Sequence, residues 1–426
     1  MATPDVPQGF EQLLAFPLVE ALFGRRSRRF ALGAAIPTGP LAFTSRHAPQ
    51  PLTEVEKMLV LTATAGNTGW HHLIKHREGS AGLPGYASSA GGRTFPAAAG
   101  LHSSDLFFTD DEGVYFFATR DAPGLVERDG DGALALEQLL EDHRARIRKV
   151  ADGRLHLPPD PFIAKHNRWC ANVPGSLFII PVADVTLELL GILCYLVENG
   201  ACIYDDVNRQ PIPGLERFRH LIDVENPGPL SELERNVLTY CTVEVSSACY
   251  AGMLILQGMG LGGWMYTGMD GLAILGASGD PTVPGLGFRY DTDERWVMPN
   301  PTGLPGVFES YCPPHYPDMR AAVAAFLQRK FGEGGPYHAS TPGPWKESAT
   351  VRGSAQLYSE EFSACVTLMA QYIYDRFGKF PGTVPSIFAG LYLQAHHLDL
   401  EFYDGHFTSS AYLWTHAQHA QDWHPE

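Results

Sequence analysis

The chain has 426 residues, of which 45% are hydrophobic and 18% charged, a composition typical of a globular protein with a sizeable core. Its formal net charge of −16 argues against nucleic acid or an anionic membrane as a partner, because both attract basic patches. Seven cysteines without Cys-x-x-Cys spacing predict buried free thiols and exclude a zinc ribbon. No secretory signal and no apolar stretch of membrane-spanning length is seen, so we expect a soluble, cytoplasmic protein.

The hydrophobic pattern predicts both helices and strands in the first part of the chain. Thr53 followed by Glu56 is a capping box, which marks the start of a helix over 52–65. Two alternating runs, 105–108 and 113–119, flank an acidic turn and predict a β-hairpin. The other elements expected before residue 280 are a strand over 176–182 and helices over 10–23, 134–150, 186–198 and 243–257.

The sequence changes in character near residue 280, where prolines and aromatic residues replace the periodic pattern. Helices are then predicted over 319–331, 359–377, 386–402 and 412–419. We therefore expect one domain over 1–280 and a mostly helical C-terminal extension over 281–426, which would cover the active site of that domain.

The most informative segment is 248–276, in which an apolar, helix-length run ends in a cluster of glycines. Such glycines let a backbone approach a flat or charged ligand closely, since no Cβ intervenes. Gly258, Gly260 and Gly263 also match the dinucleotide-binding fingerprint, but that motif needs a strand before it, and here a helix precedes it. The remaining alternative is a glycine-rich turn that packs two core elements.

A second signal is the basic cluster near the N-terminus. Arg25, Arg26, Ser27, Arg28 and Arg29 place four guanidiniums and a hydroxyl beside a predicted helix end in an acidic chain. Guanidinium groups bind phosphate through paired hydrogen bonds and keep their charge. A phosphomonoester is therefore a natural ligand, and a solvated basic turn or a surface ion-pair patch is the alternative.

Taken together, these segments resemble the flavin-dependent nitroreductase-like superfamily, most closely its SagB-type dehydrogenase branch. The family begins with an Arg-x-Ser-x-Arg/Lys element, found here at Arg25–Arg29, and a helix follows. It continues with an Arg-rich loop, a Pro-Ser-Ala-Gly step and a strand pair, matched here by 91–121, and with a long helix that ends in Gly-Leu-Gly, matched by 260–262.

The resemblance covers roughly residues 20–276 and implies a fold, a cofactor and an assembly. The fold would be α+β, a nitroreductase-like three-layer arrangement with a mixed or antiparallel sheet flanked by helices. The cofactor would be FMN, bound at the subunit interface of a homodimer with residues from both chains.

The resemblance also implies roles for individual residues. In the phosphate-binding cluster, Arg25 and Ser27 would hold the FMN phosphate, with Arg26 beside them, and Arg29 would stabilise the reduced ring near its pyrimidine edge. The residues expected to line the ring or ribityl chain are Pro96, Ala97, Ala98 and Gly100, with Met265, Tyr266, Thr267 and Gly268 packing on the ring. Ala97 stands where the family has Ser, and Asn67 in a nitroreductase-like Asn-x-x-Trp loop is an alternative ring contact.

The C-terminal segment is rich in histidine and tyrosine. His397 with Glu401, and His416 with His419, have helical spacings at which two side chains can approach one metal ion. We nevertheless favour exposed or core-capping histidines and predict no metal site, because such spacings arise often by chance. If this segment packs over the flavin, the candidate proton donors are Tyr403, His406 and Tyr412.

The function that these observations favour is an FMN-dependent oxidoreductase that transfers a hydride between flavin N5 and a small organic substrate. One alternative is a non-catalytic flavin-binding or scaffold protein of the same fold. The other is a metal-dependent enzyme that uses the C-terminal histidines.

Overall fold

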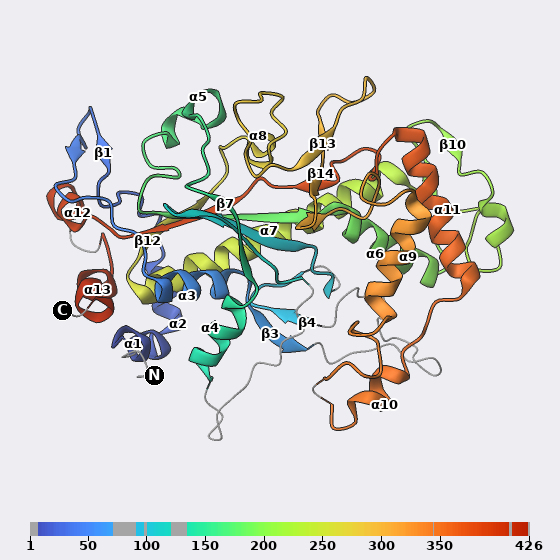
Figure 1. The fold of residues 1–426 in the computed structure, drawn as a ribbon, viewed down its shortest axis with the longest axis horizontal. Helices are drawn as coiled ribbons and strands as arrows, with labels where there is room; N and C mark the ends of the chain where they lie inside the picture. The colour runs from blue at the N-terminus through green and yellow to red at the C-terminus, as the bar shows by residue number, and fades with distance from the viewer. Residues whose placement is uncertain are drawn as a thin grey trace.

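The centre of the structure, a computed structural model, is an antiparallel sheet of seven strands (Figure 1). The residues described are 7–70, 91–97, 100–120, 134–343, 345–408 and 411–424. Six strands follow the order β12-β17-β8-β5-β6-β7, and β16 pairs with the far end of β8. Their bounds are β5 Ser104–Thr109, β6 Gly113–Phe117, β7 Ile147–Asp152, β8 Leu177–Asp184, β12 Gly262–Tyr266, β16 Ile387–Phe388 and β17 Tyr392–His396.

Two helices, α3 (Glu54–Ala65) and the 30-residue α7 (Leu230–Met259), cover one face of this sheet (Figure 1). The capping box is present at the start of α3, where Thr53 and Glu56 bond reciprocally. Helix α7 ends at Gly260, whose φ of 72° suits a residue without a side chain. The core between helices and sheet contains Met253 of α7 and Leu393 of β17.

The opposite face of the sheet is covered by short elements (Figure 1). These are α5 (Pro159–Phe162), α8 (Gly271–Leu275) and a small sheet of β13 (Arg289–Asp291), β14 (Asn300–Leu304) and β15 (Phe308–Glu309). Trp264 and Tyr266 point to this side, whereas Met265 packs toward α3 and α7, as the alternation along a strand requires.

The remaining elements lie at the two ends of the sheet. Helices α6 (Val185–Glu198), α9 (Met319–Phe331) and α11 (Glu360–Phe377) pack together at one end. At the other end, the first and last helices, α1 (Gly9–Ala15) and α13 (Trp414–Trp423), lie close together in Figure 1, and the rings of Phe10 and Trp423 are 5.8 Å apart. The elements not yet named are α2 Leu18–Gly24, α4 Leu136–Arg144, α10 Ser348–Gly353, α12 Leu400–His406, β1 Ala35–Ile36, β2 Phe43–Thr44, β3 Asn67–Trp70, β4 Gly91–Arg93, β9 Ile203–Asp205, β10 Gln210–Pro211 and β11 Gly228–Pro229.

Most of the expected elements are confirmed, and with them an α+β architecture with an antiparallel sheet. The β5–β6 hairpin, β8, α6, α9 and α11 lie where the sequence predicts them. All seven cysteines are free and buried, as expected. In the described part of the chain, no helix combines the length and apolarity needed to cross a membrane.

Four predicted helices are wrong in extent or type. The one predicted over 243–257 is only the second half of α7, which begins at Leu230. The segment 10–23 is two helices, because Phe16 before Pro17 is extended and interrupts the first. The basic end of 134–150 forms β7, an edge strand on which Arg148 and Lys149 face solvent. The segment 386–402 contains β16 and β17, and only its last residues begin α12.

The last of these differences affects the organisation of the whole chain. Strand β17 lies between β12 and β8 and is buried along its length. A short apolar run that is buried on both faces has no alternating pattern, so its sequence does not separate a strand from a helix. The central sheet therefore crosses the boundary expected near residue 280.

Candidate functional site

The basic cluster and the glycine segment lie side by side, although they are far apart in the sequence. The backbone N–H of Arg28 donates to the carbonyl of Gly263 (3.2 Å), and the N–H of Gly263 donates back (2.9 Å). The ring of His396 also bonds the Arg28 carbonyl through Nε2 (3.1 Å). The extended segment after α2 thus continues the sheet beyond β12.

Arg28 is the inward-facing member of the cluster. Its guanidinium donates to Gln257 Oε1 (2.7 Å), to the Ala411 carbonyl (2.9 Å) and to the Gly24 carbonyl (3.1 Å). Burial lowers the pKa of Arg28 to about 10, so the group remains charged at neutral pH. Its contacts join α2, α7 and the C-terminal tail, which makes its role structural.

The neighbouring side chains are differently placed. Arg25 is half-buried and Ser27 exposed, and neither side chain has a hydrogen-bond partner among the residues described. Arg26 donates only to the carbonyls of Phe23 and Arg25. No carboxylate of the described chain pairs with any of the four arginines. Such a cluster of cations, unpaired in an acidic protein, is suited to an external anion.

An aromatic stack adjoins this cluster. The guanidinium of Arg29 lies 4.2 Å from the ring centre of Trp264, and Trp264 stacks on Tyr266 with ring centres 3.7 Å apart. The Trp264 Nε1 and Tyr266 Oη atoms are buried and have no hydrogen-bond partner within the described ranges. Because Tyr266 packs in the core, the exposed residues at this end of β12 are Thr267 and Gly268.

The three proton-donor candidates have different surroundings. Tyr403 lies closest to the basic cluster, where its Oη accepts from the backbone N–H of Phe30 (3.2 Å), and burial raises its pKa to about 12. Tyr412 donates to Asp404 (2.7 Å). The Nδ1 atom of His406 contacts the Phe402 carbonyl (2.9 Å). Of the three, only Tyr403 therefore bonds the Arg25–Phe30 stretch directly.

The two loops expected to compete for the flavin ring are neighbours. Asn67 of β3 pairs with Arg93 of β4, which leads directly into Pro96 and Ala97. The side-chain amide of Asn67 is buried, and neither of its polar atoms has a partner in the described structure. Gly100 adopts a positive φ of 70°. Ala98 lies outside the described residues.

These loops lie away from the basic cluster within one chain. Glu56 at the start of α3 and Gln257 at the end of α7 are near Arg28 and the C-terminal tail, whereas Asn67 follows the other end of α3. A helix of 12 residues is roughly 18 Å long. Asn67 and Arg29 of the same chain are therefore too far apart to contact the same edge of one flavin ring.

The buried histidine beside Asn67 gives a pH-dependent prediction. The His143 Nε2 atom accepts the backbone N–H of Asn67 (2.9 Å), and its Nδ1 faces the Leu139 carbonyl (2.6 Å). Burial lowers the pKa of His143 below its ordinary value of about 6.5. The unfolded chain therefore binds this proton first, and the free energy of unfolding should fall as the pH drops below about 6.5. Between pH 7 and 5, urea unfolding should show a smaller decrease in the free energy of unfolding for His143→Gln than for the wild type. An equal decrease in the two proteins would contradict this assignment.

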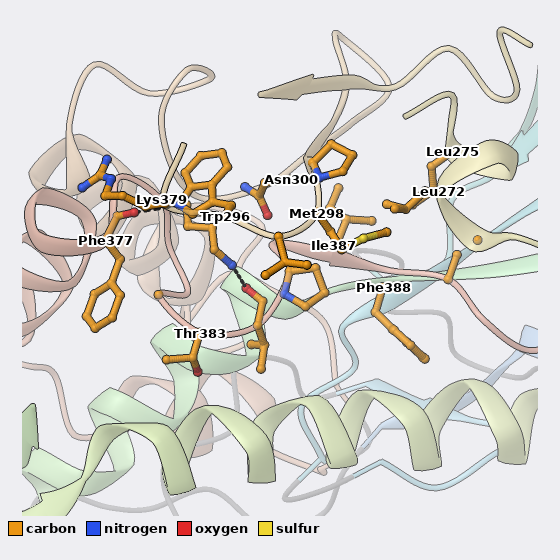
Figure 2. Close-up of a pocket in the computed structure, with 18 of the residues that line it drawn as sticks. Leu272, Leu275, Trp296, Met298, Asn300, Phe377, Lys379, Thr383, Ile387 and Phe388 are labelled. Carbon is orange, nitrogen blue, oxygen red and sulfur yellow. Dashed lines mark hydrogen bonds between the residues drawn. The ribbon is translucent and has the colours of Figure 1, made fainter. Parts of the chain in front are cut away.

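A cavity of about 650 Å³ opens beyond the end of β12, between α8 and the segments 295–300 and 377–389 (Figure 2). Its wall is largely apolar and includes Leu272, Trp296, Met298 and Phe388. Lys379 is a half-buried cation in this lining: its Nζ donates to the Val384 carbonyl (2.6 Å), and desolvation lowers its pKa to about 8. The size and polarity of this cavity suit a small organic molecule.

The C-terminal histidines are grouped differently from the expected helical pairs. Glu401 faces Arg46 and His47 at the surface, and His416 Nδ1 accepts the backbone N–H of Leu413. Instead, three histidines meet Glu56 of α3; they are His397, His419 and His424. Helical spacing could not predict this group, because its four members come from separate elements.

Comparison with known proteins adds little to this geometry. No protein-family model matches the chain, and no curated protein matches it. Among solved structures, it is similar to a protein of Ralstonia eutropha JMP134 whose description reads "putative nitroreductase". The two are 13% identical, the match covers 64% of this chain and 75% of the other, and the TM-score is 0.27. At this TM-score the similarity supports no functional assignment.

Proposed function

We propose that the protein is an FMN-dependent oxidoreductase with a nitroreductase-like fold, which transfers a hydride between flavin N5 and a small organic substrate. The observation that carries this proposal is that the side chains of Arg25 and Ser27 have no partner among the described residues and precede Arg28, which pairs with Gly263 of β12. The two motifs occur in the same order as in the flavin family. In this chain the backbones of Arg28 and Gly263 pair, so the two motifs are close enough to contact one ligand.

The residues present fit FMN in three respects. Arg25 and Ser27 offer a guanidinium and a hydroxyl to a phosphate, with Arg26 exposed beside them. Gly268 has a φ of 90°, and a Cβ there would lie 3.2 Å from Asn167 Nδ2. The close approach of the residue 268 backbone to the Asn167 side chain therefore depends on glycine. The partnerless amide of Asn67 is suited to the polar edge of a flavin ring.

In this proposal the chain's own residues bind and orient, and bound FMN supplies the electron transfer. Arg29 lies over the ring of Trp264 and would place a cation beside the flavin ring, next to the residues proposed to hold the phosphate. Tyr403 holds its proton, because its pKa is raised to about 12, and its Oη fixes the Phe30 backbone beside that cation. The apolar cavity beyond β12 would accept the substrate and exclude water.

A homodimer belongs to the proposal. Asn67 and Pro96–Gly100 of one chain lie at the other end of α3 from the basic cluster, so a site that uses both groups on one ring needs two chains. The expected arrangement is a flavin that contacts the Arg25–Arg29 segment of one subunit and the β3–β4 hairpin of its partner.

A direct test is the flavin content of purified protein and of an Arg25→Ala/Ser27→Ala double variant. A hydrogen bond to a charged group contributes about 1.5–3 kcal/mol, so the affinity for FMN should fall at least about 100-fold. Fluorescence titration of FMN measures the dissociation constant. Arg46→Ala, at an arginine whose side chain is 80% exposed, is the matched control and should bind like the wild type.

Three outcomes separate the alternatives. A colourless protein that takes up no added FMN would refute the proposal. Unchanged affinity in the double variant would refute the phosphate assignment. Bound flavin that neither NADH nor NADPH reduces, and that no organic acceptor reoxidises, would favour the non-catalytic scaffold.

A further inference from the structure

Four side chains of types that bind metals lie together where α3 meets the C-terminal segment of the chain. Glu56 lies in the first turn of α3, His397 directly follows β17, His419 lies on α13 and His424 directly follows that helix. One nitrogen or oxygen from each of the four residues lies within 4.8 Å of the other three. Figure 1 shows α13 at one end of the molecule, on the side where α3 begins.

The hydrogen bonds around this group define which ring nitrogens carry protons. The Nδ1 atom of His419 faces the Met259 carbonyl at 2.7 Å, and His397 Nε2 faces the Pro51 carbonyl at 3.3 Å. A carbonyl only accepts, so these nitrogens donate, and in neutral rings His419 Nε2 and His397 Nδ1 carry lone pairs. Those two atoms are 3.1 Å apart and face each other.

The carboxylate adds a further acceptor at the same place. Glu56 Oε1 lies 3.0 Å from His419 Nε2 and 3.2 Å from His424 Nε2. A single proton satisfies one pair of these atoms, whereas a central cation satisfies all of them. A tetrahedral Zn²⁺ with bonds of about 2.0–2.2 Å separates its ligand atoms by roughly 3.3–3.5 Å, close to the spacings seen.

The surroundings have the features of a prepared metal site. Glu56 is fully buried, and its other oxygen, Oε2, accepts from the backbone N–H and the hydroxyl of Thr53 (2.6 and 2.8 Å). Carbonyl and hydroxyl partners of this kind orient the ligands of protein metal sites. A cavity of about 160 Å³, lined by His397, His419 and His424, gives an ion access to the group.

We propose that Glu56, His397, His419 and His424 form a structural site for a divalent transition metal, with Zn²⁺ as the ion that fits best. Four protein ligands leave no open coordination position, which distinguishes a structural centre from a catalytic one. The metal would fasten the C-terminal helix α13 to the start of α3. This proposal does not depend on the flavin proposal, because none of the four residues belongs to the flavin candidates.

The test uses the full-length protein after dialysis against a chelator. Calorimetric titration with Zn²⁺ should show one site per chain, and Co²⁺ should give the visible absorption of a tetrahedral complex. His419→Ala and Glu56→Gln should each weaken Zn²⁺ binding at least about 100-fold, since even the loss of a residue that only hydrogen-bonds to a metal ligand costs about 10- to 100-fold. Glu56→Gln retains the capping box, so it separates the loss of a ligand from the loss of the helix start.

His406→Gln is the control, because His406 is a half-buried histidine of the same tail whose ring also contacts a carbonyl but faces no other ligand. It should bind Zn²⁺ like the wild type. Zn²⁺ should also raise the melting temperature and protect α13 from proteolysis in the wild type and this control, but not in the two ligand variants. The proposal is overturned if the wild type binds no Zn²⁺, or if folded His419→Ala and Glu56→Gln proteins bind it as tightly as the wild type.

Discussion

Replacing Arg28 by methionine should lower the free energy of unfolding by about 3 kcal/mol or more, because it leaves several acceptors without a donor. The side chain is 3% exposed and donates to Gln257 Oε1 and to the carbonyls of Ala411 and Gly24. Each buried acceptor that loses its partner costs about 1–3 kcal/mol. The C-terminal tail should also be held less firmly against α7, since Arg28 is one of several direct links between them. Urea unfolding followed by circular dichroism measures the change.

Arg26→Ala is the matched comparison for Arg28→Met. Arg26 is exposed and donates only to nearby carbonyls, so its removal should change stability by no more than about 0.5 kcal/mol. Arg28→Lys should lie between the two, because an ammonium keeps the charge but cannot reach three acceptors in a fork. If Arg28→Met is as stable as Arg26→Ala, the guanidinium does not hold these segments together.

Replacing Arg120 by methionine should have an effect of similar or larger size. Arg120 bonds two buried carboxylates, Asp105 at 2.7 Å and Asp184 at 3.1 Å. Removing one partner from a buried ionic group costs about 3–5 kcal/mol, because the remaining charges lose their compensation. The loss should extend to the start of α6, where Asp184 accepts from the backbone N–H groups of Thr186 and Leu187.

The pH dependence of Arg120→Met distinguishes charge from packing. Burial raises the pKa of Asp184, and Arg120 opposes that rise, so the variant should raise the pKa further. A carboxyl group whose pKa is higher in the folded state binds its proton there first, and stability is then regained as the pH falls. The deficit relative to the wild type should therefore shrink between pH 7 and 5. A constant deficit would indicate lost packing against Phe308, over which Arg120 lies at 4.2 Å.

Arg219→Ala serves as the control for Arg120→Met. Its guanidinium is largely exposed and lies 3.9 Å from Glu225, an arrangement that contributes little in water. The control should unfold with the wild-type midpoint at both pH values.

Local sequence signals determined much of the secondary structure. The Thr53–Glu56 capping box, the acidic turn of the β5–β6 hairpin and helix α9 depend on residues close together in the chain, and each lies where predicted. The two segments on which the flavin proposal rests, Arg25–Arg29 and the glycines before Trp264, were also selected from the sequence, because guanidinium clusters and glycine clusters have local patterns.

The tertiary structure alone decided how these pieces combine. It buried Arg28 and left the side chains of Arg25 and Ser27 without a partner in the part of the chain that the structure describes. The sequence of these adjacent residues does not reveal that difference. It also inserted β17 into the central sheet, where burial on both faces removes the alternation that identifies a strand. Glu56, read from the sequence only as a capping residue, meets three C-terminal histidines because the residue after β17 and the helix α13 both lie at the start of α3. Helical periodicity reports neighbours three or four residues apart, whereas this group is assembled by contacts between elements at opposite ends of the chain.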